Sequence, residues 1–305
     1  MRVSPAIERV ATARWGIVLL LAAVLFLNYV DRGALPTAAA AIQDDLGFSA
    51  GQLGVLFSAF FWSYALLQIP VGWLAERFGA QRVLAAGLAL WAAATMLVGL
   101  AHSFTVLLLL RVLLGVGESA GFPCVSKLLA TVVPAAALGR ANGVVAFAYL
   151  FGPVVGTFAS GRLTVHFGWR ATFLVFGSLS LLWLLPWSRV RLPPPVLTAA
   201  GNPHGPTLLS LLRQPSLWGT SLGHFSGNYT FYFLLSWLPY YLVREHGLSM
   251  GAMTSLATCA YLVNALSALL AGWGIDRIIA RTGRVSLSYK TSMIAAHAGS
   301  VVCML

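Results

Sequence analysis

Long apolar stretches alternate with short polar segments along the whole chain. The apolar stretches lie at about residues 15–33, 53–75, 83–101, 104–132, 141–163, 169–187, 217–243 and 252–274, and a further one runs from about 288 to the end. A helix that crosses a bilayer needs about 20 mainly apolar residues, and each of the eight complete stretches meets that length. The pattern therefore predicts an all-α polytopic membrane protein.

One polar segment is longer than the others and divides the chain. Residues 188–214 contain three consecutive prolines and a second stretch rich in glycine and proline, a composition that breaks helices and is typical of linkers. The segment follows the sixth apolar stretch. We therefore expect an N-terminal six-helix bundle over 1–187, a cytoplasmic linker over 188–214, and a C-terminal bundle over 215–305 that holds helices seven, eight and part of nine.

A short string occurs twice at an offset of 200 residues. Gly72-Trp73 precedes Glu76-Arg77 after the second apolar stretch, and Gly272-Trp273 precedes Asp276-Arg277 after the eighth. The match lies at the same place in each half, which indicates a parallel internal repeat of the kind found in large transporters. The alternative is that these charged residues merely cap helix ends.

Composition and charge agree with this interpretation. Charged residues make up 9% of the chain and hydrophobic residues 59%, whereas a soluble domain has about 25% charged residues. Soluble enzymes and disordered chains are thereby excluded. The net charge of +11 comes from arginines that fall on one side when the N-terminus is placed in the cytoplasm, as the positive-inside rule requires. The charge thus indicates topology, and it gives no reason to expect nucleic acid as a partner.

A charged residue costs about 2.5–3.5 kcal/mol at the centre of a membrane helix, and five of the charged residues within the apolar stretches are candidates for a functional role. They are Asp31, Arg32, Arg111, Glu118 and Lys127. Asp31 and Arg32 are adjacent, so their side chains point about 100° apart on a helix and each needs another partner. The alternative is that both are solvated where the first span leaves the membrane. Lys127 lies near the end of its span, and we expect it to reach the interface in a structural role.

Arg111 and Glu118 are seven residues apart, which places them two turns apart on one helix face. Glycines at 115, 117 and 121 make this helix narrow enough for close packing or for a ligand. A buried carboxylate near an arginine can gain and lose a proton as its surroundings change. The alternative is a buried ion pair with a structural role only.

The remaining polar and aromatic residues give softer signals. Most tyrosines and tryptophans of the spans are typical of the membrane interface. Tyr29, Tyr64 and Asn228 lie deeper and could face a cavity, with a place at the interface as the alternative. The histidines lack metal-ligand spacing, the three cysteines lack paired spacing, and no nucleophile–base motif occurs. We therefore expect no metal, no cofactor and no enzymatic reaction.

The string from Gly72 to Arg82 resembles the signature loop of the major facilitator superfamily, with Glu76 where aspartate is usual. More narrowly, three strings resemble the anion:cation symporter family, whose members carry organic anions such as hexuronates, galactonate and glucarate. They are Asn28-Tyr29-x-Asp31-Arg32, Arg111-x-x-x-Gly115-x-x-Glu118-x-x-x-x-Pro123, and Tyr232-Phe233-x-x-x-Trp237-Leu238-Pro239-x-Tyr241-Leu242.

The resemblance implies a function and assigns roles to residues. It implies proton-coupled symport of an organic anion, by alternating access, in a monomer of the bacterial inner membrane. Asp31 and Glu118 would couple protons, Arg32 would bind the substrate carboxylate, and Arg111 would pair with the acid of the fourth span. The full set of expected positions is proton-coupling Asp31 and Glu118; substrate-binding Tyr29, Arg32, Tyr64, Arg111 and Asn228; and conformational gate-loop Gly72, Glu76, Arg77, Gly79, Arg82, Gly272, Asp276 and Arg277.

The resemblance also leaves alternatives open. The family has twelve helices, so it implies that the second half of this chain stops within its third helix, as a fragment of a longer protein or a truncated product. The substrate could be another carboxylate, such as an aromatic acid. The chain could also be a half-transporter without transport activity.

Overall fold

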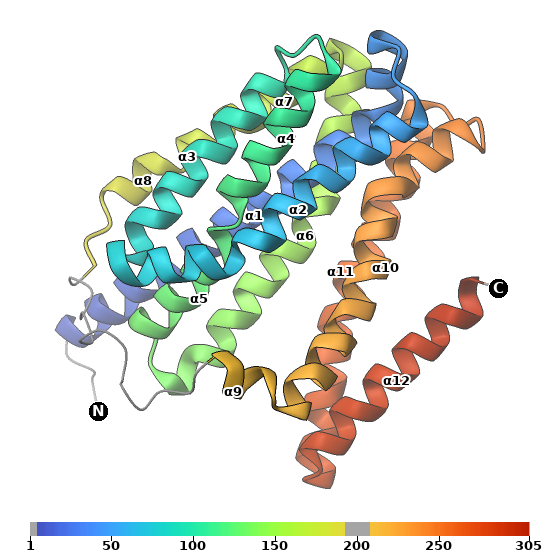
Figure 1. Ribbon diagram of the computed structural model, residues 1–305. Coiled ribbons are helices and arrows are strands. Elements are labelled where there is room, and N and C mark those ends of the chain that lie inside the picture. Colours follow the sequence, from blue (N-terminus) through green and yellow to red (C-terminus); the bar gives the residue numbers. More distant parts are fainter. Residues whose placement is uncertain (1–4, 193–207, 305) are drawn as a thin grey trace.

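The computed structural model describes residues 5–192 and 208–304, and all regular secondary structure in these ranges is helical (Figure 1). The part of the predicted linker at 193–207 lies outside the described residues. The helices are α1 (Pro5–Leu46), α2 (Ala50–Phe78), α3 (Ala80–Val98), α4 (Phe104–Glu118), α5 (Gly121–Val132), α6 (Ala135–Phe167), α7 (Trp169–Leu182), α8 (Leu184–Ser188), α9 (Leu208–Leu212), α10 (Pro215–Arg244), α11 (Met250–Thr282) and α12 (Val285–Met304).

These helices correspond to the predicted spans, with two interruptions. The fourth span is broken between α4 and α5 directly after Glu118, and the sixth between α7 and α8. In the described part of the chain, seven stretches are long and apolar enough to cross a membrane: α1 from Trp15, α2, α3, α4 with α5, α6 from Ala137, α7 with α8, and α11. α10 has the length but contains many serines, threonines and other polar residues.

The first helix is longer than the apolar stretch at residues 15–33. It does not end at Gly33 but continues to Leu46, with Pro36 inside the helix. The residues after Arg32 are small or apolar and fully enclosed, among them Ala34, Ala38 and Ile42. Their burial against neighbouring helices favours a continuous helix even though a proline removes one backbone donor.

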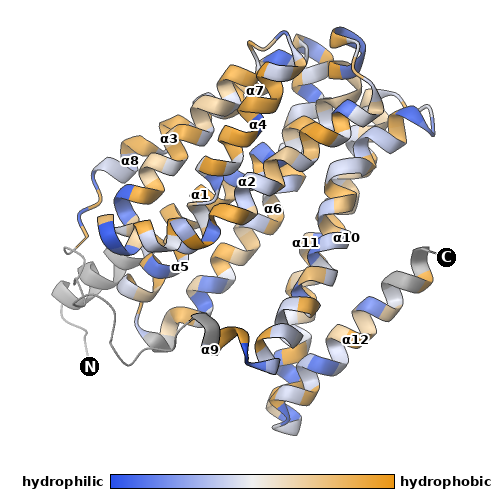
Figure 2. Cartoon of the chain, viewed as in Figure 1, coloured by the Kyte–Doolittle hydropathy of each residue, from blue (hydrophilic) through white to orange (hydrophobic). Residues whose placement is uncertain are grey.

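The bundle has two ends, which we call proximal and distal. The proximal end holds the start of α1, the turn between α2 and α3, the end of α8, and α9. The distal end holds the turns α1–α2, α6–α7 and α10–α11 (Figure 1). Apolar residues predominate along α3, α4 and α7 (Figure 2), and Leu97, Leu109 and Leu179 are among those with about half of their surface exposed. A surface of this kind is expected where helices face lipid.

Backbone contact joins α1 to α6. A Cβ atom placed on Gly156 would lie 2.4 Å from the carbonyl oxygen of Val30, and one on Gly152 would lie 2.5 Å from the Cβ of Tyr29. Only glycine permits this approach, in the way that small residues allow membrane helices to pack closely. The contact fixes the part of α1 that carries Asp31 and Arg32.

The internal repeat extends into the turns at the distal end. Gly47 and Gly247, again 200 residues apart, both adopt a positive φ, of 69° and 63°. Ser49 and Ser249 then cap α2 and α11, each accepting a hydrogen bond from the backbone N–H three residues later. Positive φ favours glycine, and serine is a preferred N-cap, so the same local sequence builds the same turn twice.

The repeated Gly-Trp string also adopts one geometry in both halves. The guanidinium of Arg77 lies 5.3 Å from the ring centroid of Trp73, and that of Arg277 lies 5.3 Å from the ring centroid of Trp273. Both pairs lie in the proximal part of a helix, where a cation–π contact orients the arginine along the helix surface. Both the sequence and the cation–π contact are thus repeated, which supports two related halves.

Candidate functional site

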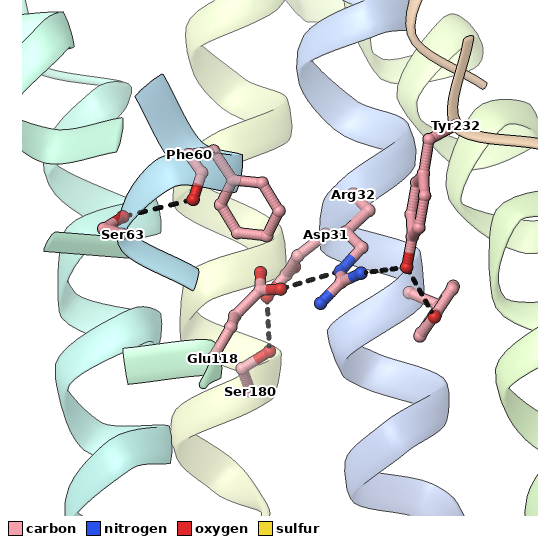
Figure 3. A network of polar contacts seen from close by, with 8 residues as sticks. Asp31, Arg32, Phe60, Ser63, Glu118, Ser180 and Tyr232 are labelled. Atoms are coloured by element: carbon pink, nitrogen blue, oxygen red, sulfur yellow. Dashed lines mark hydrogen bonds and ion pairs between the residues drawn. The ribbon is translucent and has the colours of Figure 1, made fainter. Parts of the chain in front are cut away.

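Arg32 is the centre of a buried polar network inside the bundle (Figure 3). Its Nε donates to Oε2 of Glu118 at 2.8 Å, and its Nη1 donates to the hydroxyl of Tyr232 at 2.7 Å. Arg32 is on α1 and its two partners are on α4 and α10, so three helices meet here. The network therefore joins the N-terminal bundle to the helix that follows the linker.

Aromatic rings enclose the Arg32 guanidinium. Its carbon lies 4.6 Å from the ring centroid of Tyr29, 4.5 Å from that of Tyr64 and 5.0 Å from that of Phe60. The hydroxyls of Tyr29 and Tyr232 are hydrogen-bonded to each other at 2.9 Å. Ring faces stabilise a cation electrostatically and more strongly when water is excluded, so these residues hold a desolvated positive charge in place.

Asp31 has a separate partner. The hydroxyl of Ser180 on α7 donates to its Oδ2 at 3.2 Å. This confirms the prediction that Asp31 and Arg32 do not pair with each other and that each has a different partner. The alternative that both are solvated at the membrane exit is wrong, because only 4% of Asp31 and 7% of Arg32 is exposed. The continuation of α1 to Leu46 is what keeps them inside.

Arg111 does not hold Glu118, contrary to the expectation drawn from the resemblance. Its Nε donates to the carbonyl oxygen of Leu56 on α2 at 3.1 Å, and its guanidinium lies 4.8 Å from the ring centroid of Phe60. Arg111 and Glu118 do share a helix face, but they are two turns apart, and Arg32 reaches Glu118 from the neighbouring helix. Arg111 is thus a second buried cation on the distal side of the network.

Several buried polar atoms of this region have no hydrogen-bond partner among the residues that the structure describes. They are Nη2 of Arg32, Oε1 of Glu118, Oδ1 of Asp31, and both Oδ1 and Nδ2 of Asn28. Buried polar groups are nearly always hydrogen-bonded, since an unmade bond costs about 1–3 kcal/mol. A donor and acceptors gathered in one buried place are suited to a small polar ligand that satisfies them.

Other expected positions lie elsewhere. Asn228 is half-buried on α10, one turn before Tyr232, and among the described residues no hydrogen bond joins it to the Arg32 network. The gate-loop residues are at the proximal ends of α2 and α11. There Glu76 pairs with Lys127 at 3.6 Å, so Lys127 is engaged at the surface, and Gly79 links α2 to α3 with a φ of 89°.

Four residues of the network were not singled out as site residues from the sequence. Asn28 and Tyr232 stood in the strings that carry the family resemblance, which was a usable signal. Phe60 and Ser180 had none, because one is a phenylalanine among many and the other a serine in an apolar helix. In the described ranges, no group of three or more His, Cys, Asp or Glu side chains is placed to hold a metal ion.

Comparison with known proteins agrees with this architecture. The family model of the Major Facilitator Superfamily matches residues 21–305. The chain is similar in fold to the crystal structure of a bacterial homologue of the human lysosomal transporter Spinster in an inward-facing, unoccupied conformation. The TM-score is 0.74 with 24% identity, over 94% of this chain and 72% of the other.

Curated relatives are transporters of organic anions. A probable sulfoacetate transporter of Cupriavidus necator is 31% identical over 91% of this chain and 68% of its own length. The hexuronate transporter of Bacillus subtilis is 30% identical, over 88% of this chain and 66% of its own length. A probable galactarate/D-glucarate transporter of Escherichia coli is 28% identical, over 97% of this chain and 73% of its own length. The chain thus spans roughly two thirds to three quarters of these relatives.

Proposed function

This chain belongs to the major facilitator superfamily, a family of membrane transporters and not of enzymes, and from that premise we propose that it carries an organic anion, of the sugar-acid type, together with protons. The observation that carries the proposal is the buried Arg32. One of its donors, Nη2, has no partner in the described part of the chain, and two buried carboxylates are nearby, that of Glu118 within the network and that of Asp31 beside it. A carboxylate of the substrate would complete the hydrogen bonding of this guanidinium.

The charges of the network suggest how protons and anion are coupled. Arg32 and Arg111 balance Asp31 and Glu118 when both acids are ionised. Each proton that enters leaves one positive charge uncompensated, and a buried uncompensated charge is costly. An anion removes that cost. One proton therefore matches a monocarboxylate such as a hexuronate, and two protons match a dicarboxylate such as glucarate.

Glu118 is the acid most directly placed to couple the two. Its Oε2 accepts from Arg32 Nε, and its side chain is enclosed. When Glu118 takes up a proton, it no longer competes as an anion for the guanidinium, and Arg32 is released towards the substrate. Loss of that proton on the other side of the membrane restores the Arg32–Glu118 pair and expels the anion. Asp31, which directly precedes Arg32 and accepts a hydrogen bond from Ser180, provides a second protonation site.

The transport cycle would then be a rocking of residues 1–187 against 215–305, joined through the linker at 188–214. The proximal end carries Arg77, Arg82, Arg189 and Arg191, whereas the distal arginines Arg170 and Arg244 are each paired with an aspartate. By the positive-inside rule we place the proximal end and the N-terminus in the cytoplasm of a bacterial inner membrane. The substrate and the protons would enter from the distal end.

The test is uptake into proteoliposomes. Wild-type protein should accumulate a labelled sugar acid when the outside is acidic. The variant Glu118→Gln should lose gradient-driven accumulation while retaining exchange of labelled for unlabelled substrate, because glutamine keeps the shape but binds no proton. Accumulation by Glu118→Gln equal to wild type would refute the assignment of Glu118, and uptake indifferent to the gradient would refute proton coupling.

An aromatic carboxylate is the second candidate. It is favoured by the rings of Tyr29, Tyr64 and Tyr232, which surround the guanidinium and could stack on a planar substrate. Competition distinguishes the candidates: benzoate-type acids should displace a labelled sugar acid only if these rings receive the substrate.

A protein that binds sugar acids but shows neither uptake nor exchange would instead be a half-transporter without transport activity.

A further inference from the structure

The described parts of the two halves meet at the distal end. The indole of Trp237 on α10 packs edge-on against Phe57 of α2, with ring centroids 5.2 Å apart. Nearer the proximal end, Leu222, Phe225 and Tyr229 of the same helix are each about two-thirds exposed. Figure 1 shows α10 and α11 close to α2 and α6 at the distal end and further from them at the proximal end. The structure is thus closed distally.

Polar contacts between the ends of α1 and α10 lie within this closed region. Arg244, the last residue of α10, forms an ion pair with Asp44 and donates to the carbonyl oxygen of Ala40 at 3.1 Å. One turn earlier, the hydroxyl of Tyr240 donates to Oε1 of Gln43 at 3.1 Å. Every partner on the α1 side belongs to its last two turns. These contacts therefore tie the distal end of α1 to the distal end of α10.

The neighbouring aspartate makes contacts of a different kind. Asp45 accepts from the indole N–H of Trp169 at 3.1 Å and pairs with Arg170, both at the start of α7 in its own half. Two consecutive carboxylates at the end of α1 thus have different partners. Asp45 pairs with a residue of α7, and Asp44 pairs with a residue of α10. Movement of one half against the other would break the Asp44 contact and leave the Asp45 contact intact.

The internal repeat explains why Asp44 meets Arg244. The two residues are separated by the repeat offset of 200, so they occupy equivalent positions of the two halves. The same offset separates Arg32 from Tyr232, which also touch. Residues close to a pseudo-two-fold axis face their own equivalents. At position 44/244 this chain has opposite charges where two identical charged residues would repel.

A second close contact lies at the same end. A Cβ atom placed on Gly161 of α6 would lie 2.0 Å from Oγ1 of Thr254 on α11, 2.6 Å from its Cγ2 and 2.8 Å from its Cβ. Thr254 is in the first turn or two of α11, and Gly161 is near the distal end of α6. The absence of a side chain at position 161 is therefore required for the distal ends of these two helices to meet.

From these contacts we propose that the Asp44–Arg244 ion pair is a latch that holds the distal end closed, and that Gly161 provides the space into which that end closes. Asp45 is not part of the latch; it anchors the end of α1 to α7. The inference rests on the proposed function, because a latch has a role only if the halves rock. The latch would set the equilibrium between the distally closed and the distally open form of the protein.

The test measures distances at the distal end of the full chain in lipid nanodiscs. Spin labels are attached to Ala50→Cys and Gly251→Cys, both exposed at the starts of α2 and α11, in a protein whose Cys259 and Cys303 are replaced by serine. Asp44→Asn should raise the ratio of long to short distances about two- to five-fold, the range expected for an exposed ion pair. Asp45→Asn is the matched control and should leave the ratio unchanged.

Two further measurements keep the proposal open to refutation should Asp44→Asn fail to fold. Raising the salt concentration to about 1 M, where the Debye length is about 3 Å, should lengthen the distances in wild type but not in Asp44→Asn or Arg244→Gln. Gly161→Leu should shift the population in the same direction as Asp44→Asn. An unchanged ratio in Asp44→Asn, or an equal change in Asp45→Asn, overturns the latch.

The outcomes separate the latch from the proposed function. If the distances respond as expected but uptake proves independent of the proton gradient, the latch stands and proton symport is refuted. If uptake is proton-coupled and the distances do not respond to Asp44→Asn, Arg244→Gln or salt, the protein is a symporter without this latch.

Discussion

Substituting Gly156 by alanine tests whether the contact between α1 and α6 positions the site. The new Cβ would lie 2.4 Å from the carbonyl oxygen of Val30, a full ångström short of the 3.4 Å at which ordinary contact begins, and 2.9 Å from its Cα. The obstructing atoms belong to the backbone and cannot rotate away. The two helices must therefore move apart by about 1 Å, which exceeds what a hydrogen bond of 2.8 Å tolerates.

The expected cost follows from this displacement. Inserting a methyl group into a well-packed contact costs about 1–3 kcal/mol, and a backbone obstruction belongs at the upper end of that range. Because Asp31 and Arg32 follow Val30 on α1, substrate affinity should fall as well. Gly143→Ala on the same helix is the control, since a Cβ there meets nothing within 4 Å. It should stabilise α6 by up to about 1 kcal/mol through helix propensity alone.

Thermal unfolding in detergent, followed by tryptophan fluorescence with and without a sugar acid, measures both effects. Gly156→Ala should unfold several degrees below wild type and lose most of the ligand-induced increase in melting temperature. Gly143→Ala should match or exceed wild type in both respects. Equal melting temperatures and equal ligand responses for the two variants would show that the approach of α1 to α6 neither stabilises the fold nor positions Arg32.

Three other predictions use the same assays. Arg32→Ala should weaken binding of a sugar acid by at least tenfold, whereas Lys127→Ala, at a half-exposed ion pair, should leave it within about twofold; equal effects would remove Arg32 from the site. Tyr232→Phe removes one acceptor of Arg32 and should change affinity by about five- to tenfold without loss of folding, which a titration by calorimetry would show. Trp183→Phe deletes the indole bond to a backbone carbonyl of α1 and should cost about 1 kcal/mol in unfolding, while Trp62→Phe, on an exposed ring, should cost little.

Much of the fold was predictable because membrane helices are constrained by one dominant requirement, an apolar length that crosses the bilayer. The family assignment was also predictable, since Gly72 to Arg77 and Gly272 to Arg277 stand at equivalent places. Helix ends were not. The weakly apolar residues after Arg32 indicate that α1 continues, but its end at Leu46 depends on how other helices enclose residues such as Ala38 and Ile42, a tertiary effect.

The charged residues of the candidate site were predictable from the sequence, but which of them form ion pairs with each other was not. Charge burial alone selected Asp31, Arg32, Arg111 and Glu118, which the structure places in or beside one network. Sequence spacing suggested that Arg111 and Glu118 pair, because spacing describes only one helix. Which arginine reaches Glu118 depends on how α1 lies against α4, and that depends in turn on the glycine contacts with α6.

The source of the charges in the site has a consequence for how such transporters diversify. All four charged side chains belong to α1 and α4, and α10 contributes an uncharged hydroxyl, that of Tyr232. If the proposed function holds, recognition of the carboxylate is therefore inherited with the N-terminal half as a unit. The C-terminal half is free to change the shape of the remaining wall, so joining residues 1–187 to the second half of a relative should exchange one anion for another while the dependence on a carboxylate persists.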